Sequence, residues 1–177
     1  MEFALSQTKA RDFLIVVGAS ILLALSAWIS VRIPFTPVPI SFTAPLILML
    51  SVLLGKRGAY ATALYFLEGA LGLPVFANGG CGFAYLLGPT GGYLVGFVIA
   101  SYVVGCLSEQ MQEKTPTKIF GIMLFGNALF YVFGVTHLAL LVGYANAIKF
   151  GLIPFVGLDL FKLFLANRAL KTLRFFG

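Results

Sequence analysis

An irregular segment at residues 72–97 decides how the chain must be organised; it reads GLPVFANGGCGFAYLLGPTGGYLVGF. It lies between two apolar stretches, is rich in glycine, contains two prolines, and has no Lys, Arg, Asp or Glu. Glycine permits turns and close backbone approach that side chains block. Apolar residues such as Val75, Phe76 and Phe83 are unusual in a loop that only contacts water. We therefore expect residues 74–89 to form a lid or re-entrant loop over a cavity, with an ordinary flexible outer loop as the alternative.

The composition indicates an integral membrane protein. The chain has 177 residues, of which 60% are hydrophobic and 10% are charged, and its mean hydropathy is +1.00. These values lie well outside those of soluble globular domains. The net charge of +6 could suggest a nucleic-acid partner, but the basic residues are scattered beside apolar runs and do not form one patch. We therefore expect membrane lipid, and no nucleic acid, around the chain.

Six apolar stretches are candidates for membrane spans, because a helix of about 17–25 residues crosses the hydrocarbon core of a bilayer. They cover residues 13–31, 42–54, 58–73, 91–107, 119–143 and 152–173. The stretch at 42–54 is the shortest and is joined to the next by the sequence GKRG. The predicted fold is an all-α integral membrane bundle of six transmembrane helices, with an irregular outer loop between the third and fourth. We expect one domain over residues 1–177.

The basic residues predict the direction of these spans, because Lys and Arg near the ends of short loops mark the cytoplasmic side. With six spans and an N-terminus inside, most of the twelve basic residues lie in the cytoplasm. The cytoplasmic set is Lys9, Arg11, Lys56, Arg57, Lys114, Lys118, Arg168, Lys171 and Arg174. Arg32 and Lys149 lie outside, and Lys162 falls within a span. Both termini are therefore expected in the cytoplasm, in the inner (cytoplasmic) membrane of the cell.

The first apolar run has an alternative interpretation as a secretory signal peptide. Lys9 and Arg11 resemble a basic leader region, and ALSA at residues 24–27 resembles a cleavage site. However, the run is long for a signal peptide, and its removal would leave five spans and an unexplained charge pattern. We favour a first membrane span.

A second irregular segment, RIPFTPVPISFTAP at residues 32–45, precedes the second span. Its four prolines exclude a regular helix and favour an extended outer connection. Two stiff outer segments, at residues 32–45 and 74–89, could therefore close one cavity from both sides.

Asp159 and Lys162 are the main candidates for a polar binding site. They are three positions apart, so both side chains leave one face of the sixth predicted helix. Charged residues inside a span are costly and usually functional. An acid that accepts and a base that donates would suit a neutral polar ring such as a urea or amide. The alternative is an ion pair that only holds helices together.

Other polar residues have structural and functional interpretations. Asn78 offers donors and an acceptor without charge, but an asparagine in a glycine-rich loop is often a turn residue. Glu68 either reaches the interface or lines the cavity. Asn127 and Tyr131 share one helix face, which favours hydrogen bonds between helices, with contact to a ligand as the alternative. His137, the single histidine, is interpreted as a polar contact between helices.

Small residues form a stripe on the first span. Ser20, Ala24 and Ala27 recur at helical spacing and let another helix approach closely. Internal packing and docking of a partner protein both explain this stripe. On the fourth span, Gly92 and Gly96 favour internal packing.

Five motifs in sequence cover nearly the whole chain. They are PFTPVPISF at 34–42, GALGLPVFA at 69–77, GPTGGYLVGF at 88–97, GNALFYVFG at 126–134 and GLDLFK at 157–162. Through these motifs the chain resembles the BioY family, the biotin-specific substrate-binding (S) components of energy-coupling-factor (ECF) transporters.

This resemblance implies a six-helix protein that captures biotin from the outside and passes it inward. It implies a transmembrane ECF coupling protein and two cytoplasmic ATPase subunits as partners, no cofactor, and no enzymatic activity in this chain. Asn78, Asp159 and Lys162 would contact the bicyclic head of biotin, and Tyr93 and Tyr85 would supply aromatic walls.

It also implies that the stripe of Ser20, Ala24 and Ala27 is where the coupling protein docks. Leu158 stands where the family usually has glycine, so a relative of biotin stays an alternative ligand.

Two alternative functions can be compared with the sequence. A stand-alone secondary transporter of biotin or a related molecule is compatible with the sequence. An intramembrane enzyme would need His137 or Cys81 beside a partner group, and no third orienting residue is evident. Cys81 and Cys106 lie near opposite ends of one predicted span, which argues against a disulfide, and neither has a metal-ligand spacing.

Overall fold

The computed structural model of the chain describes residues 2–32, 34 and 36–175, with the side chains of residues 2–8, 174 and 175 left out. The elements, in order, are α1 (Glu2–Trp28), β1 (Ser30–Val31), β2 (Ile40–Ser41), α2 (Thr43–Leu54), α3 (Lys56–Ala70), η1 (Ala77–Gly79), α4 (Gly82–Leu86), α5 (Gly91–Gln110), α6 (Pro116–Val142), α7 (Tyr144–Gly151) and α8 (Ile153–Phe175). The predicted cytoplasmic residue Arg174 has its side chain outside the described part. The predominantly helical architecture is as predicted.

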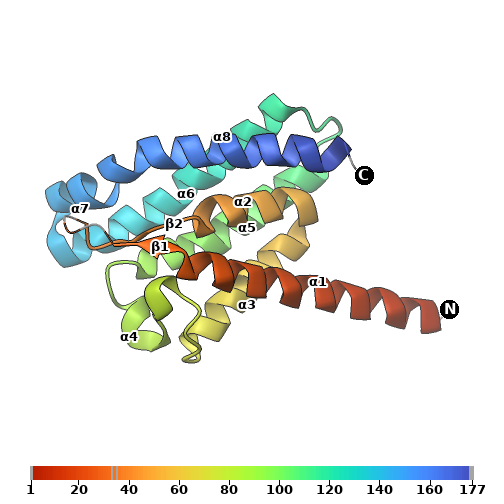
Figure 1. Cartoon of the computed structure of the whole chain (residues 1–177), viewed down its shortest axis with the longest axis horizontal. Helices are drawn as coiled ribbons and strands as arrows, with labels where there is room; N and C mark the ends of the chain where they lie inside the picture. Colours follow the sequence, from red (N-terminus) through yellow and green to blue (C-terminus); the bar gives the residue numbers. More distant parts are fainter. Residues whose placement is uncertain (1, 33, 35, 176–177) are drawn as a thin grey trace.

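The bundle has two distinct ends (Figure 1). The terminal end carries both chain termini, the corner between α2 and α3, and the link at residues 111–115. The loop end carries β1, β2, η1, α4 and α7. The predicted cytoplasmic residues Lys56 and Lys114 therefore belong to the terminal end, and the predicted outer residues Arg32 and Lys149 belong to the loop end.

Three helices are long and apolar enough to cross a membrane, as judged over the described residues. They are residues Lys9–Trp28 of α1, all of α5, and all of α6. Helix α2 is apolar but has only 12 residues, and α3 has 15. Helix α8 is long enough, with 23 residues, but it carries several charged side chains. The count of six spans thus stays a prediction for α2, α3 and α8.

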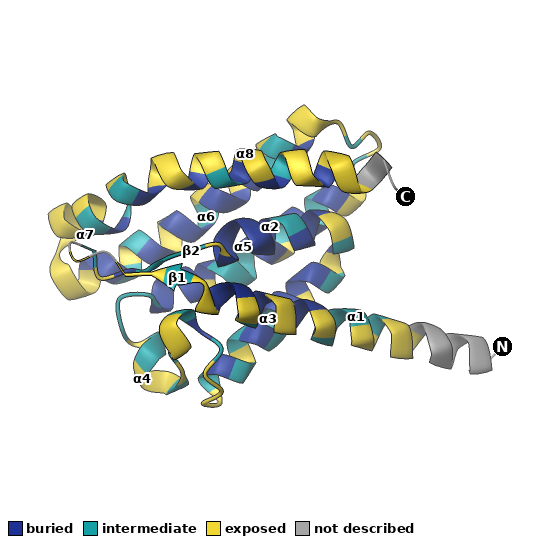
Figure 2. Ribbon diagram, viewed as in Figure 1, coloured by how far each residue is buried: buried dark blue, intermediate teal, exposed yellow. Residues whose placement is uncertain are grey.

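The outer faces of the long helices are exposed (Figure 2), and they carry many large hydrophobic residues. Exposed large hydrophobic residues include Phe13, Ile21 and Leu25 on α1, Val132 and Leu140 on α6, and Phe161 and Phe164 on α8. An apolar surface of this extent is expected where lipid is the solvent. These exposed hydrophobic faces therefore agree with the integral membrane protein that the composition indicates.

Gly55 makes the corner between α2 and α3. Its φ of +61° belongs to a region that L side chains rarely adopt, and it lets the chain turn within one residue. Glu109 of α5 accepts a hydrogen bond at 2.8 Å from the backbone N–H of Lys56, the first residue of α3. This carboxylate satisfies one free amide of the helix start. Helix α3 therefore begins at Lys56, two residues before the predicted start of the third span.

The segment at residues 32–39 connects two short strands. Strands β1 and β2 pair antiparallel, with Ser30 opposite Ser41 and Val31 opposite Ile40. Because β1 begins at Ser30, the first helix ends at Trp28, before the predicted boundary at residue 31. No helix lies among the described residues of this segment, in line with its prolines, and the strand pairing was not predicted.

The glycine-rich segment folds back on the bundle. It contains the short helices η1 and α4, neither of which was predicted. Phe76 is fully buried, and its ring stacks on Tyr85 at 5.3 Å and meets the edge of Tyr65 at 5.5 Å. The segment is therefore anchored on the bundle through Phe76 and Tyr85, whereas Phe83 and Leu87 are exposed.

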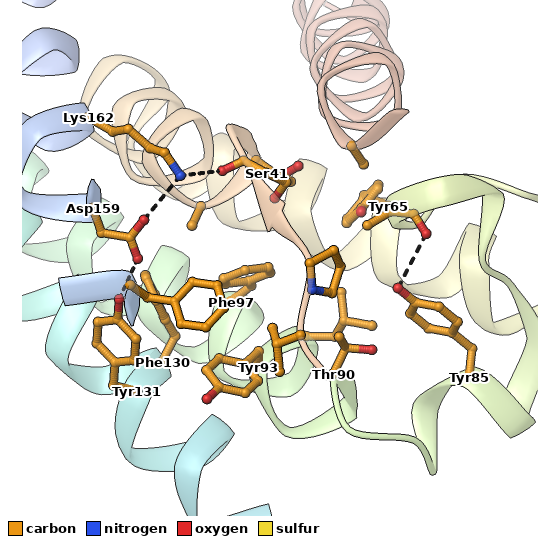
Figure 3. A pocket seen from close by; sticks show the side chains of 18 residues that line it. Ser41, Tyr65, Tyr85, Thr90, Tyr93, Phe97, Phe130, Tyr131, Asp159 and Lys162 are labelled. Atoms are coloured by element: carbon orange, nitrogen blue, oxygen red, sulfur yellow. Dashed lines mark hydrogen bonds and ion pairs between the residues drawn. The ribbon is translucent and has the colours of Figure 1, made fainter. Parts of the chain in front are cut away.

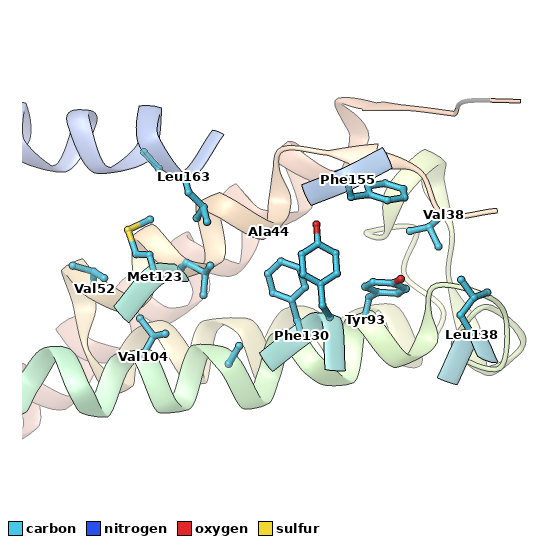
Figure 4. Close-up of a cluster of buried hydrophobic side chains, with 14 of the residues drawn as sticks. Val38, Ala44, Val52, Tyr93, Val104, Met123, Phe130, Leu138, Phe155 and Leu163 are labelled. Atoms are coloured by element: carbon cyan, nitrogen blue, oxygen red, sulfur yellow. The ribbon is translucent and has the colours of Figure 1, made fainter. Parts of the chain in front are cut away.

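The core of the bundle lies between α5 and α6 and extends to α2 and α8 (Figure 4). Phe130, Met123 and Val104 are buried there. A Cβ atom at Gly96 would lie 2.8 Å from the Cα of Phe130, so glycine is needed for this close helix contact. The internal packing predicted for Gly96 agrees with this geometry.

The stripe on α1 faces its own chain. Ser20 and Ala27 are fully buried, and the Ser20 hydroxyl donates to Glu68 Oε2 of α3 at 2.6 Å. Ala24 is half-buried. In this conformation Ser20 and Ala27 show the internal packing that was one interpretation of the stripe, and docking of a partner on it stays a prediction. Glu68 likewise belongs to the α1–α3 contact.

We predict that Gly105→Ala destabilises the protein by about 1–3 kcal/mol, because the added Cβ would lie 2.6 Å from the Gly55 carbonyl O. Thermal unfolding in detergent measures this effect. Gly121→Ala is the matched control on α6, since nothing lies within 4 Å of its Cβ position. Equal stability of both variants would contradict the close packing of α5 on the Gly55 corner.

Candidate functional site

A cavity with a free volume of about 70 Å³ lies within the loop-end half of the bundle, and we call it the inner cavity. This is below the roughly 300–1,000 Å³ of small-molecule sites, so a ligand of that size requires the lining to move apart. Residues from all the helices except α7, and from β2, line it (Figure 3). Seven of its eighteen lining residues are aromatic, and they are Tyr65, Tyr85, Tyr93, Phe97, Phe130, Tyr131 and Phe155.

One side of the inner cavity carries a buried polar network. Lys162 Nζ donates to Asp159 Oδ1 at 3.3 Å and to the carbonyl O of Ser41 at 2.9 Å. The hydroxyl of Tyr131 donates to the other carboxylate oxygen, Asp159 Oδ2. The side chains of Asp159 and Lys162 are 8% and 15% exposed. The predicted pair therefore forms, lines the cavity, and links α8 to α6 and to β2.

The network has unused hydrogen-bonding capacity. An ammonium group has three donors, and Lys162 uses two of them. A carboxylate can accept about four hydrogen bonds, and Asp159 accepts one on each oxygen. The site can therefore donate to a carbonyl oxygen of a ligand and accept from its N–H groups. The opposed charges leave it close to neutral, which favours an uncharged polar group.

Tyr93 and Tyr85 line the same cavity, as predicted, and both hydroxyl groups are engaged in the fold. Tyr93 donates to the carbonyl O of Gly151 at 2.8 Å, and its ring meets the edge of Tyr131 at 6.4 Å. Tyr85 donates to the carbonyl O of Ala77 at 3.4 Å. Their rings are therefore held in fixed positions, and they present apolar surface to the cavity.

Asn78 lies apart from the Asp159–Lys162 pair. It lines a second, wider space of about 510 Å³, which we call the outer cavity. The outer cavity is lined by Arg32, Pro34, Thr36, Pro37, Pro39, Asn78, Tyr85, Pro89 and Thr90. Asn78 has a φ of +57°, and its N–H donates to the Ser30 hydroxyl at 3.2 Å. It serves as a turn residue with a left-handed backbone, and no side-chain contact joins it to the acidic and basic pair.

Two members of the network were not predicted as site residues. Tyr131 was assigned to hydrogen bonding between helices, which it does, but it also lines the inner cavity. Its position four residues after Asn127, on one helix face with it, was the available signal. Ser41 contributes a backbone carbonyl, which no side-chain pattern can indicate.

His137 and the cysteines lie in other surroundings. His137 Nε2 lies 3.1 Å from the carbonyl O of Gly88, so it connects α6 to the segment after α4. The contact is polar, as expected, but it joins a helix to a connecting segment and does not join two helices. Cys81 is exposed, Cys106 is half-buried, and both are free thiols. Within the described residues, no group of three His, Cys, Asp or Glu is placed to hold a metal ion.

Comparison with known proteins gives the family of this chain. The model of the BioY family matches residues 2–175. The chain belongs to the BioY family. It is 41% identical to the biotin transporter BioY of Thermotoga maritima over 155 residues, which are 86% of this chain and 88% of that protein. It is 34% identical to the probable biotin transporter BioY of Pyrococcus horikoshii, with 87% of this chain and 90% of that protein covered.

The fold of this BioY-family chain also matches a crystal structure. That structure is the S-component for biotin from an ECF-type ABC transporter, and it superimposes with a TM-score of 0.85. The match covers 95% of this chain and 93% of the other, at 23% sequence identity. The helical architecture is therefore that of an S-component, and the resemblance recognised in the sequence motifs is confirmed.

Proposed function

We propose that this chain is the biotin-binding S-component of an ECF-type transporter and that it captures biotin at the outer face of the cytoplasmic membrane. The names of its relatives and the S-component fold support this function. The observation that carries it at the level of chemistry is the buried Asp159–Lys162 network beside an aromatic cavity.

The polar and aromatic lining of the inner cavity matches the chemistry of the bicyclic head of biotin. That head carries a ureido group with two N–H donors and one carbonyl acceptor, and its fused rings are otherwise largely apolar. Asp159 would accept from an N–H of the ureido group, while the unused donor of Lys162 would bind its carbonyl oxygen. Tyr93, Phe97 and Phe130 would contact the rings. In this arrangement one N–H group and the carbonyl oxygen of the ureido group are paired, which offsets most of the cost of burying it.

The direction of capture follows from the two ends of the bundle. The chain would have six spans and its terminal end would lie in the cytoplasm. The loop end, with the cavity in that half of the bundle, would then face the outside of the cell. The sequence has no glycine-rich loop ending in Gly-Lys-Ser or Gly-Lys-Thr, so energy for uptake would come from partner ATPases through a coupling protein. Of the predicted docking stripe, Ala24 is half-buried while Ser20 and Ala27 are buried, so docking of the coupling protein there would require the last two to become exposed.

We predict that Asp159→Asn weakens biotin binding about 30-fold or more. Truncating one partner of a buried, hydrogen-bonded charge pair usually costs 2–5 kcal/mol in binding, because the other charge is left unpaired. Titration calorimetry on the purified protein in detergent measures the change. Lys162→Met should weaken binding to a similar degree.

Two controls separate binding from folding. The double variant Asp159→Asn/Lys162→Met removes both charges, so its thermal stability should exceed that of either single variant. Glu113→Gln changes an exposed carboxylate at the terminal end and should bind biotin as the unmodified chain does. Unchanged affinity in both single variants would refute the site.

We predict that Cys81, exposed just before α4 at the loop end, is labelled by a membrane-impermeant maleimide on intact cells. Cys81→Ser should remove this labelling, leaving only the slower reaction of the half-buried Cys106 after permeabilisation. Labelling of Cys81 only in permeabilised cells would show that the orientation is inverted.

A further inference from the structure

We propose that Arg32, in the outer cavity, binds the carboxylate at the end of the ligand's tail and thereby selects the free acid over neutral derivatives. This inference rests on the proposed function, because it takes biotin as the ligand. It concerns a part of the molecule outside the network of Asp159 and Lys162.

The inner and outer cavities adjoin one another. Pro39, Tyr85 and Thr90 line both of them, so these residues form a shared rim between the two spaces. A ligand with its rings in the inner cavity would extend an aliphatic tail past this rim. The tail would end among the residues of the 32–39 segment, of which Arg32 is the charged one.

The charged residues of the two cavities favour this orientation of the ligand, with its rings in the inner cavity and its carboxylate in the outer one. In the inner cavity, Lys162 is already neutralised by Asp159, and a second carboxylate there would add an uncompensated buried charge. In the outer cavity, Arg32 is the one ionised lining residue among those described, and no acidic side chain lines that space. Biotin carries its carboxylate at the end opposite to the ureido group. Placing the ureido group at Asp159 therefore places the carboxylate on the side of Arg32.

The chemistry of Arg32 suits this role. A guanidinium group donates two parallel hydrogen bonds to a carboxylate in a planar arrangement. Arg32 is exposed, so it can approach an incoming anion without first losing a buried partner. It precedes the proline-rich part of the segment, in which Pro34 and Pro37 restrict the backbone.

The test compares biotin with biotinamide, in which a neutral amide replaces the carboxylate at nearly the same size. Affinities for both are measured by titration calorimetry on the purified chain in detergent. The unmodified chain should bind biotin about tenfold more tightly than biotinamide. Arg32→Gln should lose about tenfold for biotin and little for biotinamide, so that the preference disappears.

Lys149→Gln is the matched control. It removes one positive charge from the same end of the molecule, on α7, at an exposed residue that lines neither cavity. It should keep the preference for biotin. If it removes the preference as fully as Arg32→Gln does, general attraction by positive charge explains the selectivity and the proposal is overturned.

The remaining outcomes separate this inference from the proposed function. Failure of the unmodified chain to bind either compound would reject biotin capture itself. Equal binding of both compounds, or a preference that survives Arg32→Gln, would overturn only the role of Arg32. A preference that is lost in Lys162→Gln and kept in Arg32→Gln would place the carboxylate at Lys162, which reverses the ligand and also overturns the proposal.

Discussion

The structure of the binding region depends on one ion pair, between Asp159 and Lys162 of α8. Both groups are almost completely buried, and an unpaired charge in such surroundings would cost several kcal/mol, about 3–5 by the effect of removing one partner. The pair is satisfied by groups from elsewhere in the chain, the hydroxyl of Tyr131 on α6 and the carbonyl of Ser41 on β2. The cost of burying the charges thus fixes three segments around one side of the inner cavity.

The opposite side of the cavity is closed by residues tied to α1. Trp28 Nε1 donates to the carbonyl O of Pro74 at 2.8 Å, and the N–H of Asn78 donates to the hydroxyl of Ser30. The end of α1 is therefore bonded directly to the glycine-rich segment that covers the cavity. Any movement of residues 74–80 that admits a ligand must break these two bonds or carry the end of α1 with it, so access to the cavity and the position of α1 are linked.

The sequence predicted the long elements and the main polar pair, for identifiable reasons. Runs of apolar residues located α5, α6 and α8 to within about three residues at each end, because burial in lipid dominates there. The strands β1 and β2 and the short helices α4 and α7 were missed, since pieces of two to eight residues are set by contacts with distant segments. Asp159 and Lys162 stood out because charge is rare in apolar helices, whereas the carbonyl of Ser41 leaves no trace in the sequence. The burial of Ser20 and Ala27 was likewise undecidable, because small residues suit internal and external helix contacts equally.

The central claim is that the charged pair on α8 holds the polar edge of an otherwise apolar ligand. Crystallographic or cryo-electron microscopic determination of this chain with biotin tests it most directly. The account predicts the ureido group within hydrogen-bonding distance of both Asp159 and Lys162, with the rings against Tyr93 and Phe130. A ligand bound elsewhere, with the Asp159–Lys162–Tyr131 network closed and out of contact with it, would contradict the account.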